Sequence, residues 1–157
     1  MPGLVIVEDD PGAPDVRALL ARHLEFAHLH SPPEDVYALD SEALRRDVEV
    51  TFFSARLDGE VVGVGALRRL DSAHAEIKSM HTTAAARGRG VGRAVLTQLL
   101  QVARERGFER VSLETGTMAA FAPARALYAS AGFAACLPFA GYRASPNSVC
   151  MTLGLRD

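Results

Sequence analysis

The segment Arg87–Arg93, with the sequence RGRGVGR, constrains this chain more than any other stretch. It places three glycines and three arginines within seven residues, directly before an apolar-periodic run that continues to Gly107. Glycine leaves the backbone accessible, and the first N–H groups of a helix have no intrahelical partners and lie at the positive end of the helix dipole. The segment therefore predicts an anion-binding loop at a helix N-terminus, with Arg87, Arg89 and Arg93 adding positive charge.

Two other phosphate-binding motifs do not fit the spacing of this loop. A Walker loop ends in Gly-Lys-Ser/Thr, and no such tripeptide follows here. A dinucleotide fingerprint needs a glycine at its sixth position, which is Arg93 when counted from Gly88 and Val95 when counted from Gly90. The alternative to a binding role is a flexible loop whose arginines are simply solvated.

The composition indicates an ordinary globular domain. The 157 residues are 48% hydrophobic and 23% charged, which allows a sizeable core without disulfides or metals. A formal net charge of −2 disfavours a nucleic-acid binder, and no apolar run approaches the ~18 residues of a membrane span. Cys136 and Cys150 have neither metal-ligand spacing nor the density of a secreted disulfide scaffold. We therefore expect one cytoplasmic domain, residues 1–157, with no membrane, nucleic-acid or metal partner.

The order of apolar patterns and turn signals predicts a mixed α/β domain. Asp58-Gly59, between two β-branched runs, is a strong hairpin signal, so part of the sheet is expected to be antiparallel. Prolines at positions 32 and 33 end the first helix, and Gly107 is expected to cap the helix that follows the glycine loop. The predicted strands cover 3–10, 48–57, 60–70, 72–83, 109–116, 133–136 and 148–155, and the predicted helices cover 11–30, 40–47, 91–106 and 119–132.

Two motifs together resemble the Gcn5-related N-acetyltransferases (GNAT). The pattern Arg87-x-x-Gly90-x-Gly92, after a strand and opening a helix, resembles the acetyl-CoA signature of that family. The sequence ALYASAGF at Ala126–Phe133 resembles its second hallmark, a helix that carries Leu-Tyr and ends in Gly-Phe. The resemblance covers nearly the whole chain in element order. It implies the GNAT fold, a central and mostly antiparallel mixed sheet with helices on both faces, and it implies acetyl-CoA as co-substrate.

The resemblance also implies which residues hold coenzyme A. In the family the loop amides bind the pyrophosphate, and backbone groups of the preceding strand contact the pantetheine arm and the thioester carbonyl. Many relatives carry an asparagine seven residues before the helix tyrosine; Phe121 stands there in this chain, so we expect the segment FAPAR to contact the coenzyme by packing. The predicted coenzyme-binding residues are Met80, His81, Thr82, Arg87, Gly88, Arg89, Gly90, Val91, Gly92, Arg93, Phe121, Arg125 and Tyr128.

Acetyl transfer to an amine needs a group that accepts the amine proton and one that protonates the departing thiolate. Tyr128 stands where the family's helix tyrosine stands and is the predicted acid; the alternative is a tyrosine packed in the core. Glu76, eleven residues before Arg87, resembles the general base of the family's histone acetyltransferases; the alternative is a surface carboxylate paired with Lys78. Glu114 is the rival base, at the end of a strand expected to splay from the Glu76 strand; the alternative is a cap on the following turn.

The acceptor pocket of this fold lies between the first helices and the late strands, here HLHSPPED and PFAGYRASPNS. An amino-acid-like acceptor would find a carboxylate partner in Lys78 or Arg143. His23, His28 and His30 are not expected to form a metal site, because residues two apart on a helix point about 200° apart. The predicted acceptor-lining residues are His28, His30, Lys78, Phe139, Tyr142 and Asn147.

The leading hypothesis is an acetyl-CoA-dependent N-acetyltransferase that acts on a primary amine of a small molecule, either amino-acid-like or polyamine-like. Two alternatives stay open. A lysine or N-terminal acetyltransferase acting on proteins or peptides is supported by the tripeptide AEI around Glu76, and a non-catalytic coenzyme A sensor is allowed by Phe121. The resemblance further implies a homodimer, since dimers formed through the late strands are common in the superfamily.

Overall fold

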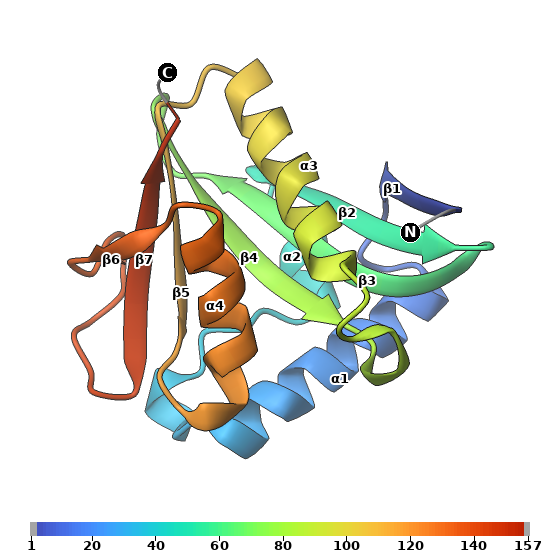
Figure 1. The fold of residues 1–157 in the computed structure, drawn as a ribbon, viewed down its shortest axis with the longest axis horizontal. Helices are drawn as coiled ribbons and strands as arrows, with labels where there is room; N and C mark the ends of the chain where they lie inside the picture. Colours follow the sequence, from blue (N-terminus) through green and yellow to red (C-terminus); the bar gives the residue numbers. More distant parts are fainter. Residues whose placement is uncertain (1–2, 156–157) are drawn as a thin grey trace.

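The computed structural model describes residues 3–155, and a seven-stranded sheet runs through it. The strand order is β1-β2-β3-β4-β5-β7-β6, and every neighbouring pair is antiparallel except β4–β5 (Figure 1). The predicted mixed, mostly antiparallel sheet is confirmed. The strands are β1 (Leu4–Glu8), β2 (Val50–Leu57), β3 (Glu60–Arg69), β4 (His74–Thr82), β5 (Arg110–Gly116), β6 (Ala134–Cys136) and β7 (Ser148–Gly154).

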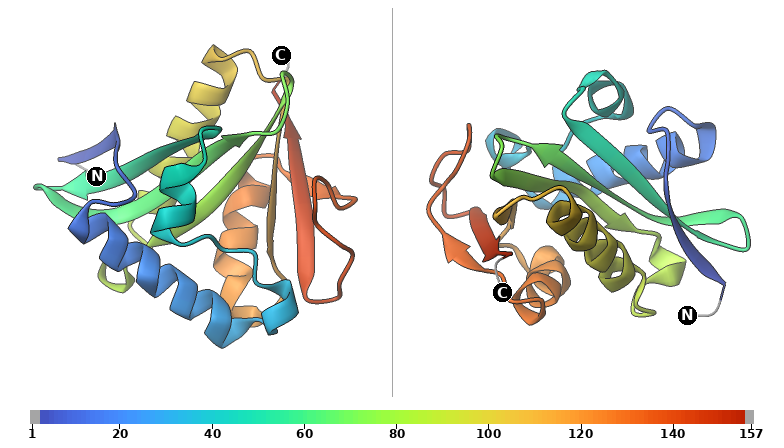
Figure 2. Two further views of the ribbon diagram at one scale, coloured as in Figure 1. Left: turned by 180° about the vertical axis from the view of Figure 1, so that it is seen from behind. Right: turned by 90° about the horizontal axis from the view of Figure 1, so that it is seen from above.

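Helices cover both faces of the sheet, as expected (Figure 2). On one face, α1 and α2 pack a smaller core that includes Leu20, Leu44 and Phe52. On the other face, α3 and α4 pack a larger core that includes Leu99 and Phe133. The helices are α1 (Pro14–His30), α2 (Ser41–Arg46), α3 (Val91–Glu105) and α4 (Ala122–Ser130), with short 3-10 turns η1 (Pro33–Asp35), η2 (Ala84–Ala86) and η3 (Ala119–Phe121).

Local turn and cap signals act as the sequence predicts. Asp58 and Gly59 have φ values of 52° and 85°, which suits a two-residue turn joining β2 to β3. Gly107 has a φ of 80° just after α3, the left-handed conformation in which many helices end. The Asp40 side chain accepts a hydrogen bond of 2.8 Å from the Ala43 N–H and caps α2.

The sheet opens between β4 and β5, its one parallel pair. These strands pair only where His74–Glu76 faces Arg110–Ser112, and Figure 1 shows them separating beyond this point. The opposite edge of β5 pairs with β7 along its whole length, so beyond Ser112 β5 is held on one side alone. Backbone groups on the facing edges of β4 and β5 therefore remain available to an extended ligand.

A β-bulge that the sequence analysis did not predict interrupts β4 at the same level. Val64 pairs with His81 and Ala66 with Lys78, so two residues of β4, Ser79 and Met80, lie opposite one residue of β3. Ser79 adopts a φ of 59°, and a bulge of this kind leaves a backbone group without a ladder partner. The bulge therefore frees backbone polar groups where the sheet opens.

Candidate active site

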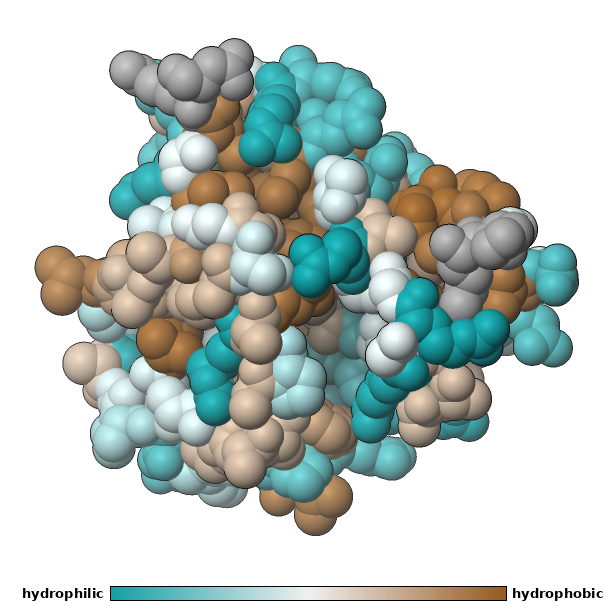
Figure 3. Space-filling view, viewed as in Figure 1, coloured by the Kyte–Doolittle hydropathy of each residue, from teal (hydrophilic) through white to brown (hydrophobic). Residues whose placement is uncertain are grey.

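A cavity of about 930 Å³ lies where β4 and β5 separate. Its walls come from α1, the segment after η1, the second half of β4, the loop before α3, the end of β5, and the η3–α4 region. Figure 3 shows the surface hollowed near the middle of the face that carries α3 and α4, with hydrophilic and hydrophobic residues interspersed around the hollow. A cavity of this size is in the range of roughly 300–1,000 Å³ that holds small molecules and cofactors.

The glycine–arginine loop lies at one wall of the cavity and has the geometry of an anion site. Gly88 and Gly90 have φ values of 76° and 86°, and Gly90 caps α3 without any side-chain hydrogen bond. A Cβ built at either glycine would meet no atom within 4 Å, so the space next to this backbone is open. The unpaired helix amides can therefore receive a phosphate directly, and Arg87 and Arg93 line the same wall.

Most of the predicted coenzyme-binding residues line the cavity, and two do not. Arg89 is exposed, outside the cavity wall. Arg125 donates from Nη1 to the carbonyl oxygens of Gly116 and Met118, at 2.8 and 3.0 Å, so its guanidinium holds the segment after β5 instead of facing the cavity. The predicted residues that line the cavity are Met80, His81, Thr82, Arg87, Gly88, Gly90, Val91, Gly92, Arg93, Phe121 and Tyr128.

Phe121 lines the cavity by packing. Its ring covers Gly116 so closely that a Cβ there would lie 2.6 Å from the Phe121 Cε2 atom. The ring also meets Phe26 of α1 edge to face, with centroids 5.5 Å apart, and the Arg87 guanidinium lies 5.5 Å from the centre of the Phe26 ring. An aromatic contact therefore joins α1 to η3 at the position where many relatives carry an asparagine.

The two candidate bases occupy different environments. Glu114 lines the cavity, and its Oε2 accepts a hydrogen bond of 2.6 Å from Ser148 Oγ. Burial raises the pKa of the Glu114 carboxyl, and the negative charges of Glu76 and Asp35 add to this effect. Glu114 is thus a carboxylate with increased basicity at the cavity wall.

Glu76 lies behind the cavity wall and is only 3% exposed. Its Oε2 accepts hydrogen bonds from the Tyr142 hydroxyl and from Lys78 Nζ, the latter at 3.2 Å. Its pairing with Lys78 is confirmed, but the alternative of a surface position is wrong. The reason is the register of β4, which places Glu76 opposite Ser112 where the two strands are still paired.

Tyr128 is both a core residue and a cavity residue. It is 5% exposed, and its ring packs edge to face on Phe133 with centroids 5.9 Å apart. Burial raises the pKa of the Tyr128 hydroxyl, and the charge of Glu114 raises it further. The phenol therefore remains protonated near neutral pH and able to donate a proton.

The predicted acceptor residues divide in the same way. Lys78 and Tyr142 line the cavity, and Lys78 Nζ donates to the Tyr142 hydroxyl at 2.8 Å. Four others lie outside the cavity wall: His28, His30, Phe139 and Asn147. The helical spacing of α1 explains His28, since it directs His23, Phe26 and Ala27 to the cavity and leaves His28 exposed. His30 shares the face of Phe26, and its ring packs behind Phe26 and Phe121.

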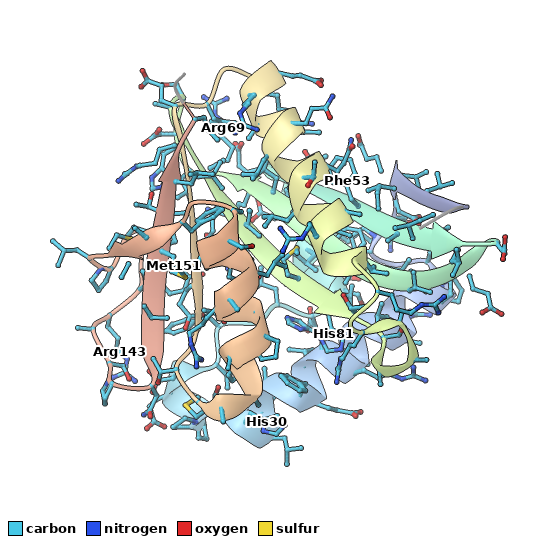
Figure 4. All side chains as sticks on the ribbon, viewed as in Figure 1. His30, Phe53, Arg69, His81, Arg143 and Met151 are labelled. Carbon is cyan, nitrogen blue, oxygen red and sulfur yellow. The ribbon has the colours of Figure 1, made fainter. Side chains whose placement is uncertain are left out.

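Figure 4 locates three of the labelled residues around the site. His30 lies at the end of α1, where its ring contacts Phe26 with centroids 4.5 Å apart. Arg143 lies in the loop between β6 and β7, and Phe139 of the same loop packs on Tyr142 at 5.0 Å. His81 lies at the end of β4 next to α1. The late loop therefore supports Tyr142 from behind and contributes to the cavity chiefly through that residue.

Sequence reasoning missed a pair of histidines that joins α1 to β4 at the cavity wall. His23 Nδ1 lies 3.1 Å from His81 Nδ1, so one ring donates a hydrogen bond and the other accepts it. Burial lowers the pKa of both rings to about 4, and the mutual interaction adds to the effect on His81. With both pKa values this low, the rings are neutral near pH 7 and the pair forms a neutral hydrogen bond.

Three further cavity residues lay outside the sequence prediction, namely Asp35, Tyr37 and Ser79. Asp35 ends the segment HLHSPPED, which the family resemblance places at the acceptor pocket, although Asp35 itself was not among the predicted lining residues; the 3-10 turn η1 places this carboxylate in the wall. Asp35 is 6% exposed, and its Oδ2 accepts hydrogen bonds from Ser145 Oγ at 3.0 Å and Asn147 Nδ2 at 3.3 Å. These partners lie more than a hundred residues away in the chain, so no local pattern could have revealed the contact.

Comparison with known proteins agrees with this geometry. The sequence profile of the Acetyltransferase (GNAT) family matches residues 13–133. The chain is 50% identical to the uncharacterized N-acetyltransferase YsnE of Bacillus subtilis (strain 168), over 92% of this chain and 95% of that protein.

Two solved structures have the same fold. A putative acyl-CoA N-acyltransferase from Klebsiella pneumoniae superimposes with a TM-score of 0.80 and 27% identity, over 98% of both chains. A GNAT family acetyltransferase from Elizabethkingia anophelis, solved with acetyl-CoA bound, superimposes with a TM-score of 0.71 and 16% identity, over 98% of this chain and 99% of that one. With the profile match and the identity to YsnE, the family is established, and this chain belongs to the GNAT family as an N-acetyltransferase.

Proposed function

We propose that the chain is a single acetyltransferase domain, residues 1–157, that transfers the acetyl group of acetyl-CoA to a primary amine of a small molecule. One observation carries the proposal. The glycine–arginine loop, with its open backbone, and Glu114, with its raised pKa, line the same cavity at the point where β4 and β5 separate. An anion site for the coenzyme and a base for the amine are thus in one chamber.

The described residues fit coenzyme A. The loop amides with Arg87 and Arg93 would hold the pyrophosphate, and the facing edges of β4 and β5 would pair with the amides of the pantetheine arm. The bulge at Ser79–Met80 frees backbone polar groups that can hydrogen-bond the thioester carbonyl. When bound, acetyl-CoA supplies a thioester whose carbonyl carbon is attacked by the amine.

Glu114 is the proposed general base. The acceptor enters as an ammonium ion at neutral pH and must lose a proton before it can attack. A carboxylate whose pKa is raised by burial accepts that proton more readily than an exposed one. Ser148 Oγ holds the orientation of Glu114, and Glu76 positions Tyr142 and Lys78 from behind the wall.

Tyr128 is the proposed general acid. Tyr128 belongs to the cavity wall and its hydroxyl stays protonated, so we propose that it donates to the thiolate that leaves. The charge of Glu114, which raises the pKa of Tyr128, also couples the two residues. At one and the same pH, Glu114 can therefore be ionised and act as the base while Tyr128 still holds the proton that it donates.

A small acceptor fits this site better than a protein. Asp35 at the end of η1, Tyr37 just after it and Tyr142 of the late loop line the same cavity as Lys78. The Lys78 ammonium already has two partners, which favours a polyamine-like over an amino-acid-like acceptor.

We place the enzyme in the cytoplasm, in keeping with its free thiols Cys136 and Cys150. No helix within residues 3–155 is long and apolar enough to cross a bilayer.

A homodimer remains part of the proposal. The short strand β6 forms one edge of the sheet, and Leu137, directly after it, is 87% exposed. An exposed edge with an apolar side chain is a surface that another copy of the chain could cover. Light scattering of the purified protein at several concentrations tests this, and a monomer mass at all concentrations would contradict it.

Calorimetric titration with acetyl-CoA, beside dephospho-CoA and ATP, tests the co-substrate first. Affinity in the micromolar range or tighter, with ATP much weaker, supports the proposal. Release of free thiol is then followed with a panel of small amines and with unfolded peptides. Turnover on peptides alone would favour the protein-modifying alternative, and tight coenzyme binding without turnover on any acceptor would favour the sensor.

A further inference from the structure

Three buried side-chain atoms among residues 3–155 have no hydrogen-bond partner, and all three belong to the wall of the same cavity. They are Asp35 Oδ1, Tyr37 OH and Ser79 Oγ. Buried polar groups are nearly always hydrogen-bonded, and one left without a partner is destabilising. All three residues line the same cavity, so a molecule bound there is one source of the missing partners.

Asp35 is the charged member of this group, and its surroundings fix its orientation. Its side chain is 2% exposed, and hydrogen bonds from Ser145 and Asn147 occupy Oδ2 alone. Arg143 Nη2 lies 3.8 Å from Oδ1, beyond hydrogen-bond distance, and the Arg143 side chain is 58% exposed. A buried carboxylate is thus held with one oxygen unmatched, which is costly unless a donor binds there.

The charge of the surrounding wall favours a cationic donor. Asp35 and Glu114 line the cavity, and their charges are close enough for Asp35 to raise the pKa of Glu114. Lys78 is the nearby cation of this wall, but its ammonium is bonded to Glu76 and to the Tyr142 hydroxyl. Glu76 offsets Lys78, and the largely exposed Arg143 lies 3.8 Å from Asp35 and offsets it in part, so Asp35 and Glu114 together leave an excess of negative charge on this wall.

We propose that Asp35 determines acceptor specificity by binding a second protonated nitrogen of the acceptor at Oδ1, while Glu114 serves the nitrogen that is acetylated. The hydroxyls of Tyr37 and Ser79 receive the remaining polar atoms of the same molecule. The acceptor class is accordingly a diamine or polyamine, because a monoamine leaves Asp35 unmatched and an amino acid brings a carboxylate next to it. This inference rests on the acetyltransferase function proposed above.

The test measures thiol release from acetyl-CoA with α,ω-diamines of increasing chain length, n-alkylamines of the same lengths and the corresponding ω-amino acids. The wild-type protein should show kcat/KM about 10- to 100-fold higher for the best diamine than for the matched monoamine, as expected for one charge-assisted hydrogen bond. Asp35→Asn should raise KM for the diamine with little change in kcat and bring the two substrates close together. Its affinity for acetyl-CoA should be unchanged.

Matched variants separate recognition from folding. Arg143→Ala removes the cation that competes for Asp35 Oδ1 and should therefore lower diamine KM. Tyr37→Phe keeps the ring contact with Tyr142, at 4.7 Å, and should raise diamine KM about 3- to 10-fold by loss of one hydroxyl. Thermal unfolding of each variant serves as the folding control. If Asp35→Asn does not fold, the proposal is tested by the preference of the wild-type protein for the diamine over the matched monoamine and by the diamine KM of Tyr37→Phe.

Equal rates on diamine and monoamine, or a preference that survives Asp35→Asn, would overturn the proposal while the acetyltransferase function stands. If acetyl-CoA binds and no amine releases thiol, the proposed function fails. The diamines are then titrated calorimetrically into protein saturated with coenzyme A. Binding that is lost in Asp35→Asn would uphold the Asp35 subsite, and no binding to the wild-type protein would overturn it.

Discussion

The cavity has two chemically different regions. The phosphate-binding part of the coenzyme region is built from one continuous segment, the glycine–arginine loop, and it offers backbone amides together with Arg87 and Arg93. The acceptor region is built from side chains of η1, β4, β5 and the loop before β7. Asp35 and its partner Ser145, for example, are separated by 110 positions. A site made of consecutive backbone groups can be read as a motif, whereas a site assembled from distant side chains exists only in the fold.

The largest expected effect is in the acceptor region, at Glu114. Glu114→Gln keeps the shape of the side chain but removes the proton acceptor, so kcat/KM should fall about 10²- to 10⁴-fold. Glu114 must be ionised to act as a base, so the activity of the wild-type protein should rise with pH around a pKa that is higher than the ordinary value for Glu. This rise of activity with pH should be absent in Glu114→Gln. Steady-state kinetics between pH 5 and 9 measures both effects.

Glu76→Gln is the matched control for this change. It removes the charge behind the wall and should lower activity less, mainly by freeing Tyr142 and Lys78. The base would be Glu76 if kcat/KM fell further in Glu76→Gln than in Glu114→Gln and if the rise of activity with pH disappeared in Glu76→Gln.

The next effect tests the group shared by both regions, Tyr128. Tyr128→Phe retains the packing on Phe133 and removes the proposed acid, so kcat should fall about 10²-fold while acetyl-CoA affinity stays constant. Single-turnover kinetics and calorimetry separate chemistry from binding. Full activity in this variant would leave Tyr128 with a packing role only.

A smaller effect is expected for the backbone of the coenzyme region. Gly90→Ala should weaken acetyl-CoA binding about tenfold, or about 1.4 kcal/mol, because a residue with a Cβ resists the φ of 86° that orients the loop amides. Gly59→Ala is the matched control, since Gly59 has a φ of 85° and equally open surroundings in the β2–β3 turn. Both variants should lose similar stability, and an equal loss of affinity in both would contradict the loop assignment.

The smallest effect concerns the neutral pair His23–His81. Both pKa values are about 4 in the folded protein and about 6.5 in an unfolded chain. As pH falls from 6.5 towards 4, the unfolded chain takes up protons that the fold does not, so stability present above pH 6.5 is lost in this window. Between pH 7 and pH 5 the free energy of unfolding should decrease in both proteins, but in His23→Gln the decrease should be smaller than in wild type by about 1–2 kcal/mol. Denaturant unfolding at both pH values measures the difference, and identical pH slopes would contradict it.

The sequence predicted most of the elements, most of the coenzyme region, and three residues that line the acceptor region, Lys78, Glu114 and Tyr142. Its hairpin, the Gly107 cap and the α3 loop each depend on interactions among neighbours in the chain, so short patterns such as Asp58-Gly59 sufficed. Only its alternative of a surface position for Glu76 was wrong, because burial there depends on strand register. Glu76 carries the expected partner Lys78 but is buried, because β4 and β5 have not yet separated at that level.

By itself the sequence determined the strand and helix order, the anion-binding loop and the family resemblance, since periodicity, turn chemistry and capping act within a few residues. Only the tertiary structure decided which side chains share the cavity. The bulge at Ser79–Met80, the aromatic contact of Phe121 with Phe26, and the orientation of Asp35 all arise from packing between distant segments. Acceptor recognition belongs to this second class, because it depends on charges that the fold alone brings together.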